Sequence, residues 1–241
     1  MNRMNNRDIK CLVMIAAYNE SDNIKNVVDD IIQNHSDYDY VIINDGSTDN
    51  TADILEANGY NYLSLSQNLG IGGAIQTGYK YAAKYGYDIA IQLDGDGQHD
   101  AAFLDDLIKP IIEKKADYVI GSRFINKEGF QSSVLRRVGI SFLSGLIRVL
   151  CSIKVLDVTS GFRAVNRLII EDFASIYPSD YPEPEAIVDA AMKNRTIMEV
   201  PVIMRERTGG TSSINPIRSV YYMIKVSMEI FLYRLGYGKT K

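Results

Sequence analysis

The sequence has few of the residues that build covalent frameworks and soft-metal sites. Its 241 residues include two cysteines and two histidines. Cys11 and Cys151 lie far apart in apolar surroundings, so neither a disulfide framework nor a cysteine metal site is expected. Two histidines are too few for a histidine-cluster metal site. A reduced chain in the cytoplasm is the simpler interpretation.

Long apolar runs and a surplus of positive charge are also missing. No stretch reaches about 18 consecutive uncharged apolar residues, so the sequence encodes no ordinary transmembrane helix. The first ten residues lack the apolar core of a signal peptide. A net charge of −4 argues against a general nucleic-acid binder. The 46% hydrophobic and 23% charged residues that remain are typical of a globular protein.

The small net charge hides a difference between the two halves of the chain. Residues 1–120 carry 9 basic and 19 acidic side chains, whereas residues 121–241 carry 17 basic and 11 acidic ones. Eleven of the thirteen arginines lie in the second half. We therefore expect the first half to hold a cation and the second half to hold anionic groups.

Short apolar segments alternate with helical patterns through the first half. Strands are expected at 10–17, 40–44, 60–65, 88–93 and 118–121, and helices at 21–35, 48–59, 72–85 and 101–115. This alternation predicts an α/β fold with a mostly parallel sheet and helices on both faces. In such sheets, ligands bind beyond the carboxyl ends of the strands.

Polar residues follow three of these strands, at 18–20 (YNE), 44–49 (NDGSTD) and 94–99 (DGDGQH). Asp94 and Asp96 repel each other unless a cation lies between them, and Gln98 adds a third oxygen ligand. Oxygen ligands suit Mg²⁺ or Mn²⁺, with phosphate oxygens completing the shell, so we predict a metal site here. For 45–49, ordinary turn and helix-capping chemistry is an equal alternative to a functional role.

A glycine-rich stretch at 68–74 (NLGIGGA) opens one of the expected helices. Its backbone around Gly70 could cradle a phosphate, or its glycines could allow close packing of the helix on the sheet. It matches neither the dinucleotide fingerprint nor a Walker A motif. Both interpretations stay open.

Taken in order, 16–20 (AAYNE), 44–49, 68–78 and 94–98 resemble family 2 glycosyltransferases, which have the GT-A fold. In the second half, 121–123 (GSR), 157–163 (DVTSGFR) and 207–212 (RTGGTS) resemble the polyprenyl-phosphate sugar synthases, such as the dolichyl-phosphate mannose synthases. The resemblance covers about residues 9–214. It implies a GT-A domain at 1–214, with a nucleotide and metal half at 8–121 and an acceptor half at 122–214.

The resemblance also implies roles for individual residues. A nucleotide sugar would contact Ala16, Tyr18, Glu20, Asp45, Gly70, Asp94 and Arg207. The catalytic set would be Asp94, Asp96, Arg123 and Arg207, and the metal ligands would be Asp94, Asp96 and Gln98. A lipid phosphate would contact Arg123, Arg137, Ser141 and Arg163.

A helix is expected at 134–153, with two stripes of different character. Its apolar stripe comprises Leu135, Val138, Phe142, Leu146, Val149 and Ile153. Its polar stripe comprises Arg137, Ser141, Ser144 and Arg148. A core helix with a solvated polar stripe is the common case, but arginines without interleaved acids favour an interfacial helix at a membrane surface.

A second amphipathic helix is expected in the C-terminal part, 215–241. Its apolar stripe comprises Ile217, Val220, Tyr221, Ile224, Met228, Phe231 and Leu235. We expect it to pack on the domain or on a second copy of the chain, with membrane contact as the alternative.

Transfer of a sugar from a nucleotide sugar needs a stabilised diphosphate and a nucleophile. A lipid phosphate is anionic and attacks unaided, whereas a sugar hydroxyl needs a general base, for which Glu185 or Asp157 is a candidate. We predict an inverting, metal-dependent glycosyltransferase that uses a UDP-linked donor and a polyprenyl phosphate. It would be cytoplasmic and attached peripherally to the cytoplasmic membrane, through the membrane surface or a membrane protein.

Three alternatives belong to other classes of reaction or protein. One is transfer to a saccharide hydroxyl in polysaccharide synthesis. Another is a sugar nucleotidyltransferase, although the glycine-rich signature of such enzymes is missing from the first strand. The third is a non-catalytic binding or scaffold protein on the same fold.

Overall fold

The computed structural model describes residues 9–131, 133–180, 182–206, 225–228 and 231–232. In these parts of the chain, seven strands form one sheet. The strands are β1 (Cys11–Ala17), β2 (Asp39–Asn44), β3 (Tyr62–Ser64), β4 (Ile89–Asp94), β5 (Tyr118–Ser122), β6 (Arg163–Asn166) and β7 (Ile197–Pro201). The helices are α1 (Ile24–Asn34), α2 (Thr51–Ala57), α3 (Gly70–Tyr85), α4 (Leu104–Ile112), α5 (Val134–Cys151), α6 (Arg167–Ser175) and α7 (Pro182–Met192), and a 3₁₀ turn, η1 (Ala101–Phe103), precedes α4.

The sheet is mostly parallel, as the alternation of strands and helices predicts. Its strand order is β3-β2-β1-β4-β6-β5-β7. Only β6 runs antiparallel to its neighbours β4 and β5 among the paired strands described. Five of the seven strands match segments expected in the first half of the sequence, and the predicted α/β class is confirmed.

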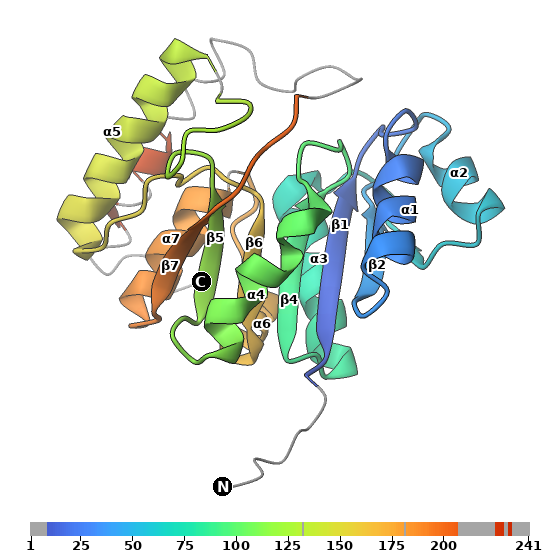
Figure 1. The fold of residues 1–241 in the computed structure, drawn as a ribbon, viewed down its shortest axis with the longest axis horizontal. Helices are drawn as coiled ribbons and strands as arrows, with labels where there is room; N and C mark the ends of the chain where they lie inside the picture. The colour runs from blue at the N-terminus through green and yellow to red at the C-terminus, as the bar shows by residue number, and fades with distance from the viewer. Residues whose placement is uncertain (1–8, 132, 181, 207–224, 229–230, 233–241) are drawn as a thin grey trace, which may run out of the picture.

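Helices cover both faces of the sheet (Figure 1). Helices α1, α2 and α4 pack on one face, and α3, α5, α6 and α7 pack on the other. The strands supply both cores because successive side chains point to opposite faces. In β4, Ile89, Ile91 and Leu93 join the first core, while Ala90 joins the second.

The sequence also predicts a helix that ends at about Lys193 and a strand at 197–204, which the structure shows as α7 and β7. It predicts neither strand β6 nor helix α6. β6 has four residues, Arg-Ala-Val-Asn, which is too short and too polar at its ends to show a strand pattern. It nevertheless pairs with β4 on one side and β5 on the other. The nucleotide and acceptor halves proposed from the sequence are therefore joined in one sheet through β6.

The described part of the C-terminal region is helical at 225–228 and 231–232. Val226 is fully buried in the core that also contains residues of α5 and α7, and Lys225 forms an ion pair with Asp180. Met228 and Phe231, which belong to the predicted apolar stripe, are more than half exposed. The packing residue here is thus Val226, which the stripe omitted; the rest of the predicted helix lies outside the described residues.

Within the described ranges, no helix has the length and apolar character needed to cross a membrane. Even α5, with 18 residues, carries three arginines.

Candidate functional site

The loops that follow β1 and β2 are tied together by hydrogen bonds. Asn19 adopts a left-handed backbone with φ 56°, which asparagine tolerates better than most residues. Its side-chain oxygen accepts the backbone N–H of Thr48 at 2.8 Å and of Asp49 at 3.3 Å. Its own N–H donates to the Ser47 hydroxyl at 3.0 Å. These contacts give the edge of the sheet a defined shape, and sequence inspection had given Asn19 no role of its own.

Two carboxylates predicted to contact nucleotide, those of Glu20 and Asp45, are buried in these loops. Asp45 accepts the N–H of Leu69 at 2.7 Å, just before α3, and so holds the start of that helix. Burial raises the pKa of Asp45, while the N–H groups of Leu69 and Gly70 oppose the rise. Glu20 is also buried and accepts the amide of Asn23 at 3.0 Å. The structural alternative for 45–49 therefore applies at least to Asp45.

The remaining predicted nucleotide contacts lie along the same edge. Ala16 pairs with Ile43 of β2 and Asp94 of β4, and its carbonyl accepts the N–H of Gly95 at 2.8 Å. The Tyr18 side chain is 46% exposed at the rim. Gly70 begins α3 with φ 77°, a left-handed conformation that favours glycine. These residues could surround a ligand, and their contact with nucleotide stays a prediction.

The predicted metal ligands occupy the loop that follows β4. Asp94 ends the strand with its side chain 35% exposed. Asp96 accepts the N–H of Gln98 at 3.0 Å, and the Gln98 amide donates to the carbonyl of Arg205 at 3.4 Å. Among the described residues, no group of three His, Cys, Asp or Glu side chains could hold a metal by itself. Two carboxylates and one amide oxygen suit a hard cation that takes its other ligands from phosphate.

His99 lies directly beneath this loop and was missed as a site residue. It is buried, and its ring stacks on Phe162 with centroids 4.9 Å apart and 10° between the planes. Its Nδ1 accepts the backbone N–H of Asp94 at 3.1 Å. Burial, against the opposing charge of Asp96 and together with the positive charge of Arg123, lowers the pKa of His99 to about 4. The imidazole is therefore neutral at pH 7.

The loop 157–162 approaches the same carboxylate from the other side. A Cβ on Gly161 would lie 2.9 Å from Oδ2 of Asp94 and 3.4 Å from Nε2 of Gln92. Because that space is occupied, glycine is required at this position for close approach. Gln92 is fully buried, and its two polar side-chain atoms have no partner among the described residues. The two sequence motifs, 94–99 and 157–163, thus meet at one point.

Asp157 is not available as a general base. It is fully buried and forms a two-pronged ion pair with Arg123, with both N···O distances 2.7 Å. It also accepts the backbone N–H of Arg123 at 3.1 Å. The prediction that Asp157 could serve as a base is wrong because its carboxylate is occupied by this pair. The pair also turns most of the Arg123 donors inward, with a further bond to Thr159 at 3.2 Å.

Arg163 is not a ligand for lipid phosphate in this structure, so that prediction is wrong. Its side chain is completely buried. The guanidinium donates to the carbonyls of Ser160, Val158 and Glu183 and to the Tyr118 hydroxyl. Arg163 instead joins the loop 157–162 to the first turn of α7. Among the described arginines of the second half, Arg123 and Arg163 are therefore buried and do not line an open pocket together with the exposed Arg137.

The first turn of α7 carries Glu183 close to the site. Burial raises the pKa of the Glu183 carboxyl; the positive charge of Arg163 opposes this, while the negative charge of Asp94 adds to it and Arg136 opposes it. Charges at the end of β4 and in the first turn of α5 therefore influence the Glu183 carboxyl. The sequence had favoured Glu185 of the same turn, which is half-buried and stays a candidate base.

The outer face of α5 exposes part of each predicted stripe, whereas Ser144, Leu146 and Ile153 are partly buried. Its inner face is formed by Ile140, Leu143 and Ile147, which are buried. Val138 is 62% and Val149 is 78% exposed, and Phe142 lies between them. Arg136, Arg137, Ser141 and Arg148 are exposed as well. Leu146 and Ile153 of the predicted apolar stripe pack against the core beside these buried residues, whereas Val138, Phe142 and Val149 are exposed, so the stripe divides between core and surface.

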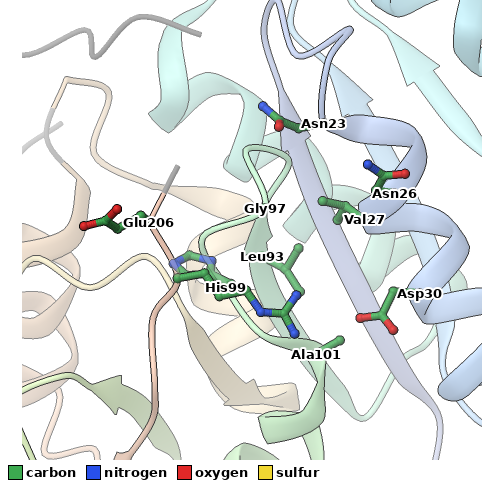
Figure 2. A pocket seen from close by; sticks show the side chains of 10 residues that line it. Asn23, Asn26, Val27, Asp30, Leu93, Gly97, His99, Ala101 and Glu206 are labelled. Atoms are coloured by element: carbon green, nitrogen blue, oxygen red, sulfur yellow. The ribbon is translucent and has the colours of Figure 1, made fainter. Parts of the chain in front are cut away.

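The chain after β7 returns to the loop 94–99. Arg205 donates its N–H to the carbonyl of Gln98 at 2.9 Å and forms an ion pair with Asp100 at 2.8 Å. A hollow of about 250 Å³ lies here, and its lining includes His99, Arg205 and Glu206. Figure 2 shows Asn26 and Asp30 of α1 across from His99 and Glu206. The predicted Arg207 lies outside the described residues, but the segment that leads to it is bonded to the metal loop.

Comparison with known proteins identifies a matching family model and several similar sequences. Residues 12–173 match the family model described as glycosyl transferase family 2. The chain is 34% identical over 210 residues to UDP-N-acetylglucosamine–dolichyl-phosphate N-acetylglucosaminyltransferase of Methanococcus voltae, covering 79% of this chain and 83% of the relative. It is 26% identical over 228 residues to polyprenol monophosphomannose synthase of Mycolicibacterium smegmatis, covering 90% and 86%.

Solved structures show the same fold at lower identity. One is glucosyl-3-phosphoglycerate synthase from Mycobacterium tuberculosis, in complex with Mn²⁺, uridine diphosphate and phosphoglyceric acid. The TM-score is 0.72 at 20% identity, with 96% of this chain and 80% of that chain covered. The match supports the predicted GT-A type of sheet and helices.

Proposed function

Because the chain belongs to glycosyl transferase family 2 and is a glycosyltransferase, we propose that it transfers a sugar from a nucleotide sugar to a polyprenyl phosphate. The donor is UDP-linked. The acceptor phosphate oxygen bonds to the anomeric carbon as the bond to the nucleoside diphosphate breaks. A single displacement of this kind inverts the configuration at that carbon.

The outer face of α5 is the observation that carries the lipid acceptor. It exposes Val138, Phe142 and Val149 beside Arg137 and Arg148. An exposed apolar stripe flanked by arginines suits the boundary between acyl chains and anionic headgroups. The names of the Methanococcus and Mycolicibacterium relatives, which act on dolichyl phosphate or polyprenol, support the same acceptor class.

The donor diphosphate lies at the carboxyl end of β4. Asp94, Asp96 and Gln98 would hold Mg²⁺ or Mn²⁺, and phosphate oxygens would supply further ligands. The ion, when bound, stabilises the negative charge of the departing diphosphate as a Lewis acid. Asp45 and Gly70, through the start of α3, form the other side of the donor site. Arg207 would add positive charge near the phosphates.

The pairing of a candidate base with an arginine also favours a lipid phosphate as the acceptor. Asp157 is committed to Arg123 and cannot take a proton from a hydroxyl acceptor. A phosphate monoester is already anionic at neutral pH and needs positive charge rather than a base. Arg136 and Arg137, in the first turn of α5, are exposed and supply that charge.

Access to a lipid requires the enzyme to work at a membrane. We place it on the cytoplasmic face, attached peripherally through α5 and the exposed side chains of the C-terminal helical residues Met228 and Phe231. Nucleotide sugars then reach the site from the cytoplasm while the lipid phosphate enters beside α5.

The test is incubation of the purified chain with labelled nucleotide sugars, undecaprenyl phosphate and Mn²⁺, followed by organic extraction. Label is expected in the organic phase, with the anomeric configuration opposite to that of the donor. It should disappear with EDTA and in the Asp96→Asn variant. Label that enters only an added saccharide, or stays aqueous with every donor, would overturn the lipid acceptor.

A further inference from the structure

The orientation of the His99 ring is fixed by its contacts. The backbone N–H of Asp94 points at Nδ1 from 3.1 Å. A proton on Nδ1 would face that N–H, so Nδ1 must carry the lone pair and the proton must be on Nε2. Nε2 lies 3.7 Å from Oδ2 of Asp94. Both ring nitrogens therefore address the same aspartate, one through its backbone and one through its carboxylate.

Two separate segments hold His99 in place. Phe162 of the loop 157–162 stacks in parallel on one face of the ring. The backbone of His99 forms a bridge with Met204, in the segment after β7. His99 also lines the hollow, with Asn26 and Asp30 of α1 on the other side in Figure 2. The imidazole therefore contacts Asp94 and also borders this hollow.

A separation of 3.7 Å is longer than a direct hydrogen bond, so in this structure the contact is electrostatic. Contacts of this kind often tighten when the substrate binds. Carboxylates that ligate metals are commonly held by a hydrogen bond from a neighbouring group, which sets their direction. Gly161 limits the carboxylate from the opposite side, where even a Cβ would meet Oδ2 at 2.9 Å.

We propose that His99 is the positioning residue for Asp94: its Nε2–H holds the carboxylate in the direction needed for the metal and the donor diphosphate. This inference rests on the proposed function, because that function makes Asp94 a ligand. His99 touches neither the donor nor the acceptor in this scheme. Its effect is on the affinity of the site for metal with nucleotide.

The first test observes the tautomer in the unmodified protein. Two-bond ¹⁵N–¹H spectra resolve the imidazoles easily, since the chain has only His35 and His99. The expected pattern for the His99 ring is a protonated Nε2 and an unprotonated Nδ1 at pH 7. A proton on Nδ1, or equal occupancy of the two tautomers as in a free ring, would overturn the proposal.

The second test separates the two ring nitrogens by substitution. In His99→Gln the side-chain amide can replace Nε2, whereas in His99→Asn it can replace only Nδ1. Binding of Mn²⁺ in the presence of UDP is followed by electron paramagnetic resonance, and His35→Gln is the control. We expect His99→Asn to weaken Mn²⁺ binding about 10- to 100-fold, a typical cost of removing such a contact. His99→Gln should keep most of the affinity, and the control all of it.

A purely structural role would give a different pattern. The two variants would then lose melting temperature and affinity together, or would bind Mn²⁺ as the wild type does, and either result overturns the proposal. If the wild type binds Mn²⁺ with UDP and the variants differ as expected, but no lipid is glycosylated, the positioning role stands and the proposed acceptor falls. Wild-type protein that binds no Mn²⁺ with UDP would overturn both.

Discussion

The charged residues have different roles in two regions of the molecule. One is the proposed donor edge, at the carboxyl ends of β1, β2 and β4; the other is the proposed acceptor side, which includes β5, β6 and α5. Around β1 and β2, the carboxylates of Asp45 and Asp49 accept backbone N–H groups and shape the loops. At β4, Asp94 stays partly exposed at the sheet edge. On the acceptor side, Arg123 and Arg163 are buried and bind internal partners, whereas Arg137 and Arg148 on α5 face outward.

This difference shows that a count of charges does not reveal how many can meet a ligand. In each half some charges are used to hold a loop in place, and others remain near the surface for chemistry or recognition. A buried guanidinium must be paired and fully hydrogen-bonded because its desolvation is costly. The internal arginines therefore stabilise the fold. Substitutions of the internal arginines should lower the free energy of unfolding, whereas substitutions of the exposed arginines should weaken binding to ligands or membranes.

The largest expected effect is the loss of Asp94 from the donor edge. Asp94→Asn keeps the shape but removes the charge that a metal needs, so transfer should fall at least about 100- to 1000-fold. The measurement is the initial rate of label transfer to lipid at saturating donor. Asp106→Asn, on the exposed side of α4, is the control and should keep the wild-type rate. Equal rates for both variants would remove Asp94 from the catalytic set.

On the acceptor side, the buried pair Arg123–Asp157 should dominate stability. Arg123→Met leaves Asp157 charged, buried and unpaired, which costs about 3–5 kcal/mol. The double variant Arg123→Met/Asp157→Leu should recover much of this loss, because no isolated charge remains. Urea unfolding measures both.

The matched comparison is the exposed Arg137, on α5. Arg137→Met should change the free energy of unfolding by no more than about 0.5 kcal/mol. If it proved as destabilising as Arg123→Met, the distinction between framework and surface arginines would be wrong.

A smaller effect should appear when the exposed arginines meet a membrane. Each of Arg137→Gln and Arg148→Gln should weaken binding to vesicles containing anionic lipid about fivefold, as expected for the loss of one charge at the surface. Lys80→Gln and Lys84→Gln on α3 serve as controls of equal charge change. Cosedimentation with vesicles at low and physiological salt gives the affinities. Equal losses for the α3 variants would mean that net charge, and not α5, directs the binding.

The last comparison concerns the two thiols, one in each half. Burial, with the charges of Asp88, Asp39 and Asp105, raises the pKa of Cys11 to about 11. Cys11 therefore stays a thiol at pH 8, whereas Cys151 on α5 is only half-buried. A thiol-specific dye should label Cys151 at least about tenfold faster, since the thiolate is the reactive form.

The Cys151→Ser variant should lose the fast phase of labelling, and Cys11→Ser should lose the slow phase. The folded-state pKa of Cys11 lies above its unfolded value, so its contribution to stability is present below about pH 9 and is lost as the pH rises towards 11. A fast phase assigned to Cys11 would contradict the buried position of β1.

Most of the sheet was predictable because its strands are apolar runs of adequate length. Elements β1, β2, β4 and β5 were placed within one or two residues of their observed bounds. β6 was not predictable, since four residues with polar ends carry no periodic signal. Its antiparallel position between β4 and β5 depends on long-range pairing that no local pattern specifies.

The site divides in the same way. The spacing of Asp94, Asp96 and Gln98 predicts a loop with oxygen ligands, and this stays a prediction. The order of motifs predicts the family, which the comparison with known proteins confirms. The sequence did not show that Arg123 would pair with Asp157, because the two residues are 34 positions apart. It did not single out His99 either, although this residue directly follows the metal motif.

The sequence by itself determined the alternating α/β pattern, the position of polar loops at strand ends and the chemical character of those loops. Only the tertiary structure decided which charged side chains are buried and paired inside the protein. Arg163 and Arg137 are alike in type, yet one is enclosed by four acceptors and the other faces outward. The physical reason is that a charged side chain becomes buried only when segments distant in sequence pack together. The same packing supplies the partners that compensate for its desolvation, and the local sequence does not specify them.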